Sequence, residues 1–202
     1  MKNKIVLLGH ASVRIEGERC VYVDPWKLKG AQPVADIILI THPHFDHFSP
    51  NDVTRISDGG TEILCPKECA GDLGAQASAM KPGETKTVKG VEIRAVAAYN
   101  IGKKFHPKSA GWMGYVVTMG GESIYVAGDT DAVPEMNELK NITVALLPVG
   151  GTYTMSAKEA ADVANRIAPA LAIPIHFGDI VGSAADGKEF QRLCKVKTQL
   201  PD

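Results

Sequence analysis

The chain has 202 residues, of which 45% are hydrophobic and 22% charged, and its formal net charge at pH 7 is −1. This is the composition of an ordinary globular protein, and it excludes a disordered or fibrous one. The near-neutral charge gives no hint of the basic surface typical of nucleic-acid-binding domains, and no apolar run reaches the roughly 18 residues of a membrane helix. We therefore expect neither a nucleic acid nor a membrane as partner.

The start of the chain and its cysteines favour a cytoplasmic location. Residues 1–10 begin with basic residues but hold too few apolar ones to act as a signal peptide. The four cysteines, Cys20, Cys65, Cys69 and Cys194, are too scattered for a disulfide framework, which suits a reducing compartment. The length suits a single domain over residues 1–202.

Strands and helices are predicted along the whole chain. Short runs of β-branched and apolar residues, broken by Gly and Pro, predict strands within residues 4–10, 12–17, 20–25, 35–42, 61–66, 86–100, 112–130, 142–150 and 170–179. Capping residues and apolar spacing predict helices within residues 49–57, 67–73, 156–169 and 186–194. Because strands and helices mix in both halves, a layered sandwich of sheets with helices outside is the expected architecture.

Residues 42–47, His-Pro-His-Phe-Asp-His, follow the continuous apolar run of residues 35–41. His42 and His44 are two residues apart, so in an extended chain they point the same way. Asp46 and His47 lie where the chain turns toward the helix that begins after Ser49, and they can face a second point nearby. Clustered neutral imidazoles would be costly to bury without a cation, so this segment is predicted to bind metal, with zinc, iron or manganese suited to its ligands.

Two later strands also end in potential ligands. Asp129 follows one apolar strand and is placed to bridge two ions, and His176 ends another and could complete the second ion's shell. His10 also ends a strand, and it is predicted either to line the site or to pack as a core histidine. Asp24 is predicted either to orient a ligand histidine or to serve as a turn residue before Pro25.

These motifs resemble the metallo-β-lactamase superfamily. They are H-x-H-x-D-H at residues 42–47, G-D-T at residues 128–130 and the late His176. Residues 9–17, GHASVRIEG, and 22–26, YVDPW, resemble the branch that contains ascorbate-6-phosphate lactonase and many uncharacterised metal-dependent hydrolases. The resemblance implies an α+β fold, an αββα four-layer sandwich in which two mixed β-sheets pack face to face with helices outside and metals at one edge.

The resemblance also implies residue roles. It implies ligands of a first ion at His42 and His44, ligands of a second ion at Asp46, His47 and His176, and a bridging ligand at Asp129. Asp46 matches a position that often serves in proton transfer, and the position of His10 lies near the site. The cofactor expected is a pair of zinc ions, with Mn²⁺ or Fe²⁺ as alternatives.

One position departs from the family pattern. The third histidine of the first ion usually follows the strand at residues 91–98, where this chain has Tyr99 and Asn100. His106 could fold back to restore a three-histidine site, which we favour because zinc prefers imidazole to an amide oxygen. Alternatively, Asn100 is a weak ligand, or the first site binds weakly and one ion is held tightly.

The function predicted is a metal-dependent hydrolase in which a metal-activated water attacks a small ester, lactone or phosphoester. Lys103, Lys104 and Lys108 share one loop, which either docks an anionic substrate such as a phosphorylated lactone or is only a solvated loop. The alternatives are a phosphodiesterase or nuclease of the same fold, a diiron redox protein, and a non-catalytic metal or ligand sensor. A homo-oligomer is compatible with the sequence.

Trp112 and Met113 are predicted to be core residues.

Overall fold

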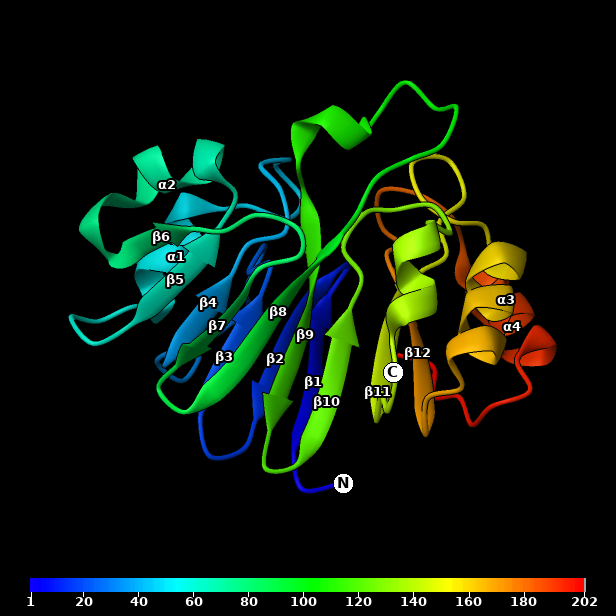
Figure 1. Cartoon of the computed structure of the whole chain (residues 1–202), viewed down its shortest axis with the longest axis horizontal. Coiled ribbons are helices and arrows are strands. Elements are labelled where there is room, and N and C mark those ends of the chain that lie inside the picture. The colour runs from blue at the N-terminus through cyan, green and yellow to red at the C-terminus, as the bar shows by residue number, and fades with distance from the viewer. Residues whose placement is uncertain (202) are drawn as a thin grey trace.

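Two six-stranded sheets form the centre of the computed structural model, which describes residues 1–201 (Figure 1). The strand order of the first sheet is β1 (Lys4–Gly9), β2 (Ser12–Glu16), β3 (Cys20–Val23), β4 (Ile37–Leu39), β5 (Glu62–Cys65) and β6 (Ala77–Ala79). The order of the second is β12 (Leu171–Ile175), β11 (Val144–Pro148), β10 (Glu122–Val126), β9 (Met113–Met119), β8 (Val91–Ala97) and β7 (Thr85–Val88).

The helices lie in two groups on either side of the sheets. They are α1 (Pro50–Ile56), α2 (Lys67–Leu73), α3 (Ala157–Ile167) and α4 (Ala184–Leu193), with short 3-10 helices η1 (Gly74–Gln76), η2 (Lys108–Ala110) and η3 (Pro134–Glu138). In Figure 1, α1 and α2 lie beside the first sheet and α3 and α4 beside the second. No helix of the described part of the chain is both long and apolar enough to cross a membrane.

Three hydrophobic clusters separate the four layers. The inner faces of both sheets share one cluster, which includes Val23 of β3 and Leu39 of β4. The preceding residue of each strand, Tyr22 or Ile38, points to the opposite face and packs with α1 and α2. A third cluster joins the second sheet to α3 and α4 and includes the fully buried Phe190. Alternate side chains of each central strand therefore enter different cores, which explains why these strands are apolar at nearly every position. The αββα sandwich expected from the sequence is confirmed.

Both sheets are mixed, and their geometry brings strand ends together. In the first sheet, β3 to β6 are parallel and β1 runs in the direction of β3, because β2 is antiparallel to both. In the second sheet, β10 to β12 are parallel and β8 runs with them. The carboxyl ends of β1, β3 and β4, and those of β8, β10 and β12, thus lie at one edge of their respective sheets. Open sheets bind ligands outside such carboxyl ends.

The local sequence signals account for most elements. Gly120 and Gly121 both have positive φ and join β9 to β10 as an antiparallel hairpin. Ser156 and Glu159 form the predicted capping box at the start of α3, with the Glu159 backbone N–H donating to Ser156 Oγ at 3.3 Å. Ser49 caps α1, with Pro50 in its first turn.

Several elements differ from the sequence prediction. Strand β4 is only three residues long, and neither β6 nor the 3-10 helices η1, η2 and η3 are predicted. Helix α4 begins at Ala184, two residues earlier than predicted, because Ser183 and Asp186 form a second capping box. These elements are short or depend on tertiary contacts, so periodicity alone does not reveal them.

Glu122 attaches the start of the chain to the second sheet, and this attachment should make stability depend on pH. Its carboxylate accepts hydrogen bonds from the backbone N–H groups of Asn3 (2.9 Å) and Lys2 (2.8 Å). The hydrogen bond from Asn3 lowers the pKa of Glu122, so the carboxylate stabilises the folded state above its ordinary pKa of about 4.3 and loses this effect as the pH falls below it. We expect Glu122→Gln to lower the free energy of unfolding by about 1 kcal/mol at neutral pH, with the difference shrinking near pH 3.

Urea unfolding of both proteins at the two pH values measures this difference. A difference that stays equal or grows on acidification would contradict the assignment.

Candidate metal centre

The chemically active side chains predicted from the sequence come together at the edge where these strands end. His10 follows β1, residues 42–47 follow β4, and His106 lies in the loop after β8. Asp129 and His176 follow β10 and β12. Both sheets contribute, and a hydrogen bond from the backbone N–H of His176 to the carbonyl of His10 (3.0 Å) joins them here.

Two groups of side chains each converge on a point. In the first group, which comprises His42, His44 and His106, one ligand atom from each residue lies within 4.8 Å of the others. In the second group, which comprises His10, Asp46, His47 and His176, the ligand atoms satisfy the same limit. Each group has the spacing at which several donors could hold one metal ion.

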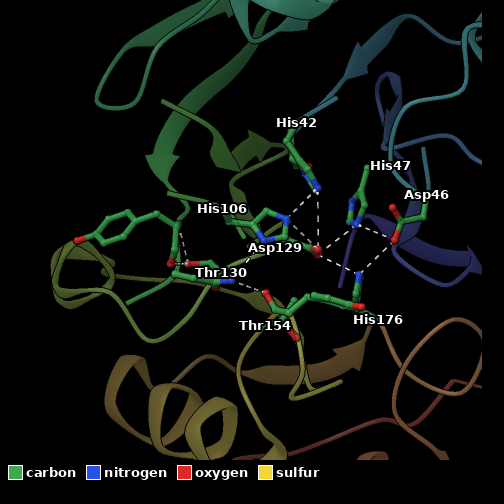
Figure 2. A network of polar contacts seen from close by, with 12 residues as sticks. His42, Asp46, His47, His106, Asp129, Thr130, Thr154 and His176 are labelled. Carbon is green, nitrogen blue, oxygen red and sulfur yellow. Dashed lines mark hydrogen bonds and ion pairs between the residues drawn. The ribbon is translucent and has the colours of Figure 1, made fainter. Parts of the chain in front are cut away.

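Asp129 lies between the two groups. Its Oδ1 is 3.1 Å from Nε2 of both His47 and His176, which belong to the second group. Its Oδ2 faces the first group, 3.4 Å from His106 Nε2 and 3.9 Å from His42 Nε2. Figure 2 shows these imidazoles pointing at the Asp129 carboxylate from opposite sides. One oxygen of a single carboxylate therefore faces each group.

Several of the donor atoms are buried without a hydrogen-bond partner in the described part of the chain, as expected for atoms that bind a metal ion. His47 Nε2, His176 Nε2 and Asp129 Oδ1 are buried and have no hydrogen-bond partner among the described residues. Buried polar atoms are rarely left without a partner, because each one costs free energy. Convergent lone pairs of imidazole and carboxylate are what a divalent cation of the zinc type requires, so these residues fit a bound metal.

The electrostatics of the first group suit a cation. Burial lowers the pKa of His42, and it lowers the pKa of His106 to about 4. Both rings are therefore neutral at pH 7, and neutral imidazole is the form that binds metal. In the second group, burial alone would lower the pKa of His47, but the carboxylates of Asp129 and Asp24 raise it. A metal ion would replace the proton on that ring.

Asp24 supports the second group from behind. Its Oδ2 accepts hydrogen bonds from His47 Nδ1 (2.7 Å) and Thr41 Oγ1 (2.6 Å), and its Oδ1 accepts one from the Thr41 backbone N–H (2.7 Å). This leaves Nε2 of His47 directed at Asp129. Of the two interpretations of Asp24, the structure therefore supports an orienting role, although its φ of 49° also places it at a turn.

The structure places His106 among the donors of the first group. His106 is 2% exposed, and its Nε2 lies 3.4 Å from His42 Nε2. Asn100 donates from Nδ2 to the Tyr153 carbonyl (2.6 Å), and that nitrogen lies 3.3 Å from His106 Nδ1. Asn100 Nδ2 thus lies beside the His106 ring, and Asn100 Oδ1 is buried without a hydrogen-bond partner among the described residues.

His10 contacts Asp46. Its Nε2 lies 3.2 Å from Asp46 Oδ2, and its side chain is fully buried. Like Asp24, His106 and His176, His10 has a positive φ, an unusual conformation for residues other than glycine. Four such residues around one centre indicate backbone held in place by the surrounding fold.

Two contributors could not be recognised from the sequence. Trp112, predicted as core, is half-buried and packs against the rings of His42 (5.2 Å between centroids), His44 (4.9 Å) and His106 (5.4 Å). Met113 is fully buried, as predicted.

Gly150 is the second contributor that the sequence does not reveal. A Cβ at this position would lie 2.5 Å from the His176 carbonyl oxygen, so only glycine lets the loop after β11 approach His176.

The lysine loop has other partners. Lys103 Nζ lies 2.5 Å from Asp131 Oδ1 and 2.7 Å from the Thr154 carbonyl. Lys108 Nζ lies 2.9 Å from Glu135 Oε1. Only Lys104 remains as an exposed cation without such a contact among the residues described, so the loop gives little support for anion docking.

Comparison with known proteins identifies the family of the chain. A family model described as the beta-lactamase superfamily domain matches residues 4–176. The chain is 33% identical to a UPF0173 metal-dependent hydrolase of Pyrococcus abyssi, covering 98% of this chain and 94% of that one. It is 34% identical to the corresponding protein of Thermococcus kodakarensis, with the same coverage.

Solved structures show the same fold. A protein of Parabacteroides distasonis superimposes with a TM-score of 0.89 at 33% identity, covering 98% of this chain and 92% of that one. Igni18, a metallo hydrolase of Ignicoccus hospitalis, superimposes with a TM-score of 0.82 at 23% identity, covering 99% and 95%.

The fold and the clustered donors define a metal-dependent hydrolase of the metallo-β-lactamase type. The chain belongs to the metallo-β-lactamase superfamily, in its UPF0173 branch of metal-dependent hydrolases.

Proposed function

We propose that this hydrolase holds two metal ions and uses a water between them to cleave a small ester, lactone or phosphoester. The first ion is assigned to His42, His44 and His106. The second is assigned to Asp46, His47 and His176, with Asp129 bridging. Zinc suits this donor set best, and Mn²⁺ or Fe²⁺ is compatible with it.

The observation that carries the proposal is the position of Asp129. Its two oxygens face separate groups of imidazoles, at 3.1 Å on one side and 3.4 Å on the other. A single ion would leave one of these groups without a cation. Two adjacent ions account for both groups with one shared carboxylate.

The protein side chains divide the remaining work. Metal held by these residues would lower the pKa of a bound water toward about 7 and would stabilise the negative charge that develops on the attacked group. Asp46 is assigned as the acceptor of the proton that the water loses. His10 donates from Nε2 to Asp46 Oδ2 and is assigned to hold that carboxylate in position. Trp112 packs against all three rings of the first group and is assigned to hold them in place.

Metal removal tests the proposal. The purified protein is dialysed against a chelator and assayed on p-nitrophenyl acetate, a γ-lactone and bis(p-nitrophenyl) phosphate before and after Zn²⁺, Mn²⁺ or Fe²⁺ is returned. We expect turnover of the ester or lactone to disappear with the metal and to return with it. Turnover that survives complete removal of metal would refute the proposal.

The same assay separates the alternatives. Cleavage of the phosphodiester alone would favour a phosphodiesterase or nuclease. Stoichiometric metal binding with no turnover of any substrate would favour a sensor. A phosphorylated lactone is the weaker version of the proposal, since Lys103 and Lys108 are already paired with carboxylates. A cytoplasmic location and a single domain over residues 1–202 complete the proposal, and both rest on the sequence.

Asp24 offers a test of the second ion's support. Asp24→Asn keeps the size of the side chain but replaces a charged acceptor behind His47 with an amide. We expect metal affinity to fall by about 10–100-fold, as is usual for the outer partners of ligating histidines. Competition with a metal-binding dye measures this. Asp36, a carboxylate that accepts from the Cys20 backbone N–H and precedes β4 at the end opposite the centre, provides the matched control Asp36→Asn. Equal affinities of the two variants would contradict the role of Asp24.

A further inference from the structure

A cavity of about 240 Å³ opens directly over the candidate metal centre. Half of its lining residues are donors already described: His44, Asp46, His106 and Asp129. The other half are aromatic or aliphatic: Phe45, Phe105, Tyr153 and Ile180. The reactive groups of the centre are therefore reached through an opening with apolar walls.

These apolar side chains are unusually exposed. Phe45 is 69% exposed, Phe105 45% and Ile180 39%, and they come from the loops after β4, β8 and β12. Leaving a side chain of this size in water forgoes about 1.5–3 kcal/mol of burial free energy. A single exposed apolar residue is unremarkable, but a set around one opening usually marks a binding site.

The aromatic residues are held in place from behind. The Phe105 ring contacts Tyr153 edge to face, with centroids 5.0 Å apart and planes at 90°. The Phe45 ring lies 6.1 Å from Trp26 at 73°. Phe45 also stands between His44 and Asp46, so its backbone moves only if those donors move. The apolar walls are thus preformed.

The cavity provides no cation from the protein. Neither lysine nor arginine occurs among its lining residues as described for residues 1–201. Lys27, which lies near Trp26, pairs with Asp179 at 3.6 Å. The lining instead carries two carboxylates, Asp46 and Asp129. A negatively charged group on the substrate, apart from the bond to be cleaved, would therefore find no cationic partner in the walls.

The size of the cavity limits the substrate. An apolar protein cavity of about 150 Å³ binds benzene, and drug-sized ligands occupy about 300–1,000 Å³. A volume of about 240 Å³ lies between these values. It suits one ring or a short branched chain together with the scissile group.

We propose that the substrate is an uncharged ester or lactone with an apolar group of about phenyl size, which binds between Phe45, Phe105 and Ile180 while its carbonyl faces Asp129. This inference rests on the proposed hydrolase function and narrows its substrate class. Apolar contact with these walls supplies the binding free energy, and the metal centre is left to act on the carbonyl.

Three methyl esters with the same leaving group test the proposal on the metal-loaded protein: methyl 3-phenylpropanoate, methyl butanoate and monomethyl succinate. We expect kcat/KM for the phenyl ester to exceed that for each of the others by at least about tenfold, since even one methylene in an apolar pocket is worth that much. Phe45→Ala and Phe105→Ala should raise KM for the phenyl ester more than for methyl butanoate, because the shorter apolar chain loses less contact with these walls. Val34→Ala, at an exposed apolar residue that does not line the cavity, is the matched control.

Ile180→Lys adds a cation to the wall. It should improve kcat/KM for monomethyl succinate and lower it for the phenyl ester. Equal rates for the phenyl and succinate esters in the wild-type protein, or an unchanged preference in Ile180→Lys, would overturn the proposal.

A binding measurement separates this inference from the hydrolase function. NMR titration with 3-phenylpropan-1-ol, compared with butan-1-ol, requires no turnover. If no ester is cleaved but the phenyl alcohol binds at least tenfold more tightly and loses this advantage in Phe45→Ala, the hydrolase function fails and the apolar site stands. Equal binding of the two alcohols overturns the inference. A change of oligomeric state in the Phe45→Ala, Phe105→Ala double variant, without any change in KM, also overturns it and assigns this surface to a second copy of the chain.

Discussion

Asp129→Ala is expected to abolish metal-dependent turnover and to lower the bound metal to one ion per chain or fewer. The substitution removes a carboxylate that lies between the two groups, with its oxygens 3.1 Å from His47 Nε2 and 3.4 Å from His106 Nε2. Metal pairs contribute several kcal/mol to transition-state stabilisation, so kcat should fall by about a thousandfold or more. Elemental analysis of the purified variant and an ester assay measure both effects.

The matched control for this variant is Asp162→Ala on the exposed surface of α3. It should keep the metal content and kcat of the wild-type protein. Circular dichroism distinguishes loss of the centre from loss of the fold. A folded Asp129→Ala protein that retains two ions and normal turnover would show that the centre is wrongly assigned.

His106→Ala is expected to lose the first ion, whereas Asn100→Ala should retain it. His106 Nε2 converges with His42 and His44, but Asn100 directs its Nδ2 toward the Tyr153 carbonyl. Losing one of three imidazoles leaves too few strong donors for tight binding, so one ion per chain should remain and kcat should fall by about a hundredfold or more. Asn100→Ala removes only a neighbour of the His106 ring, and about a tenfold loss of affinity is expected.

Metal titration of the two variants decides between these assignments. The reverse result, in which Asn100→Ala loses an ion and His106→Ala keeps both, would identify Asn100 as the ligand. Equal loss in both variants would mean that the loop after β8 acts as a unit and that no single side chain in it completes the first group.

The strands and helices could be predicted because their sequence signals are strong and local, and the resemblance to the metallo-β-lactamase superfamily implied their arrangement. The run at residues 37–40 is apolar throughout, since Ile38 packs under α1 and α2 while Leu39 packs between the sheets. The cap at Ser156 and the turn at Gly120 and Gly121 also appear where the pattern places them. By contrast, β6 has only three residues, and its identity as a strand comes from pairing with β5. Such an element has no signal of its own.

Some residues of the candidate centre could likewise be predicted from the sequence, and others could not. The histidines and aspartates could be named because their residue types are unusual at strand ends. The sequence leaves three possibilities for the first ion: His106 as third ligand, Asn100 as third ligand, or a weakly bound ion. It cannot decide between them because the path of the loop after β8 is not encoded in a local pattern. The packing of Trp112 on three imidazoles and the apolar walls at Phe45, Phe105 and Ile180 depend on loops from distant strands. Side chains that meet only through tertiary structure leave no periodic pattern to read.

The metal content of the wild-type protein tests the central claim most directly. The protein is stripped with a chelator and titrated with Zn²⁺, and the ions bound per chain are counted by elemental analysis after removal of free metal. Two tightly bound ions per chain are expected, with catalytic activity rising as the second ion binds. Binding of no ion, or full activity with a single ion, would contradict a two-ion centre joined by Asp129.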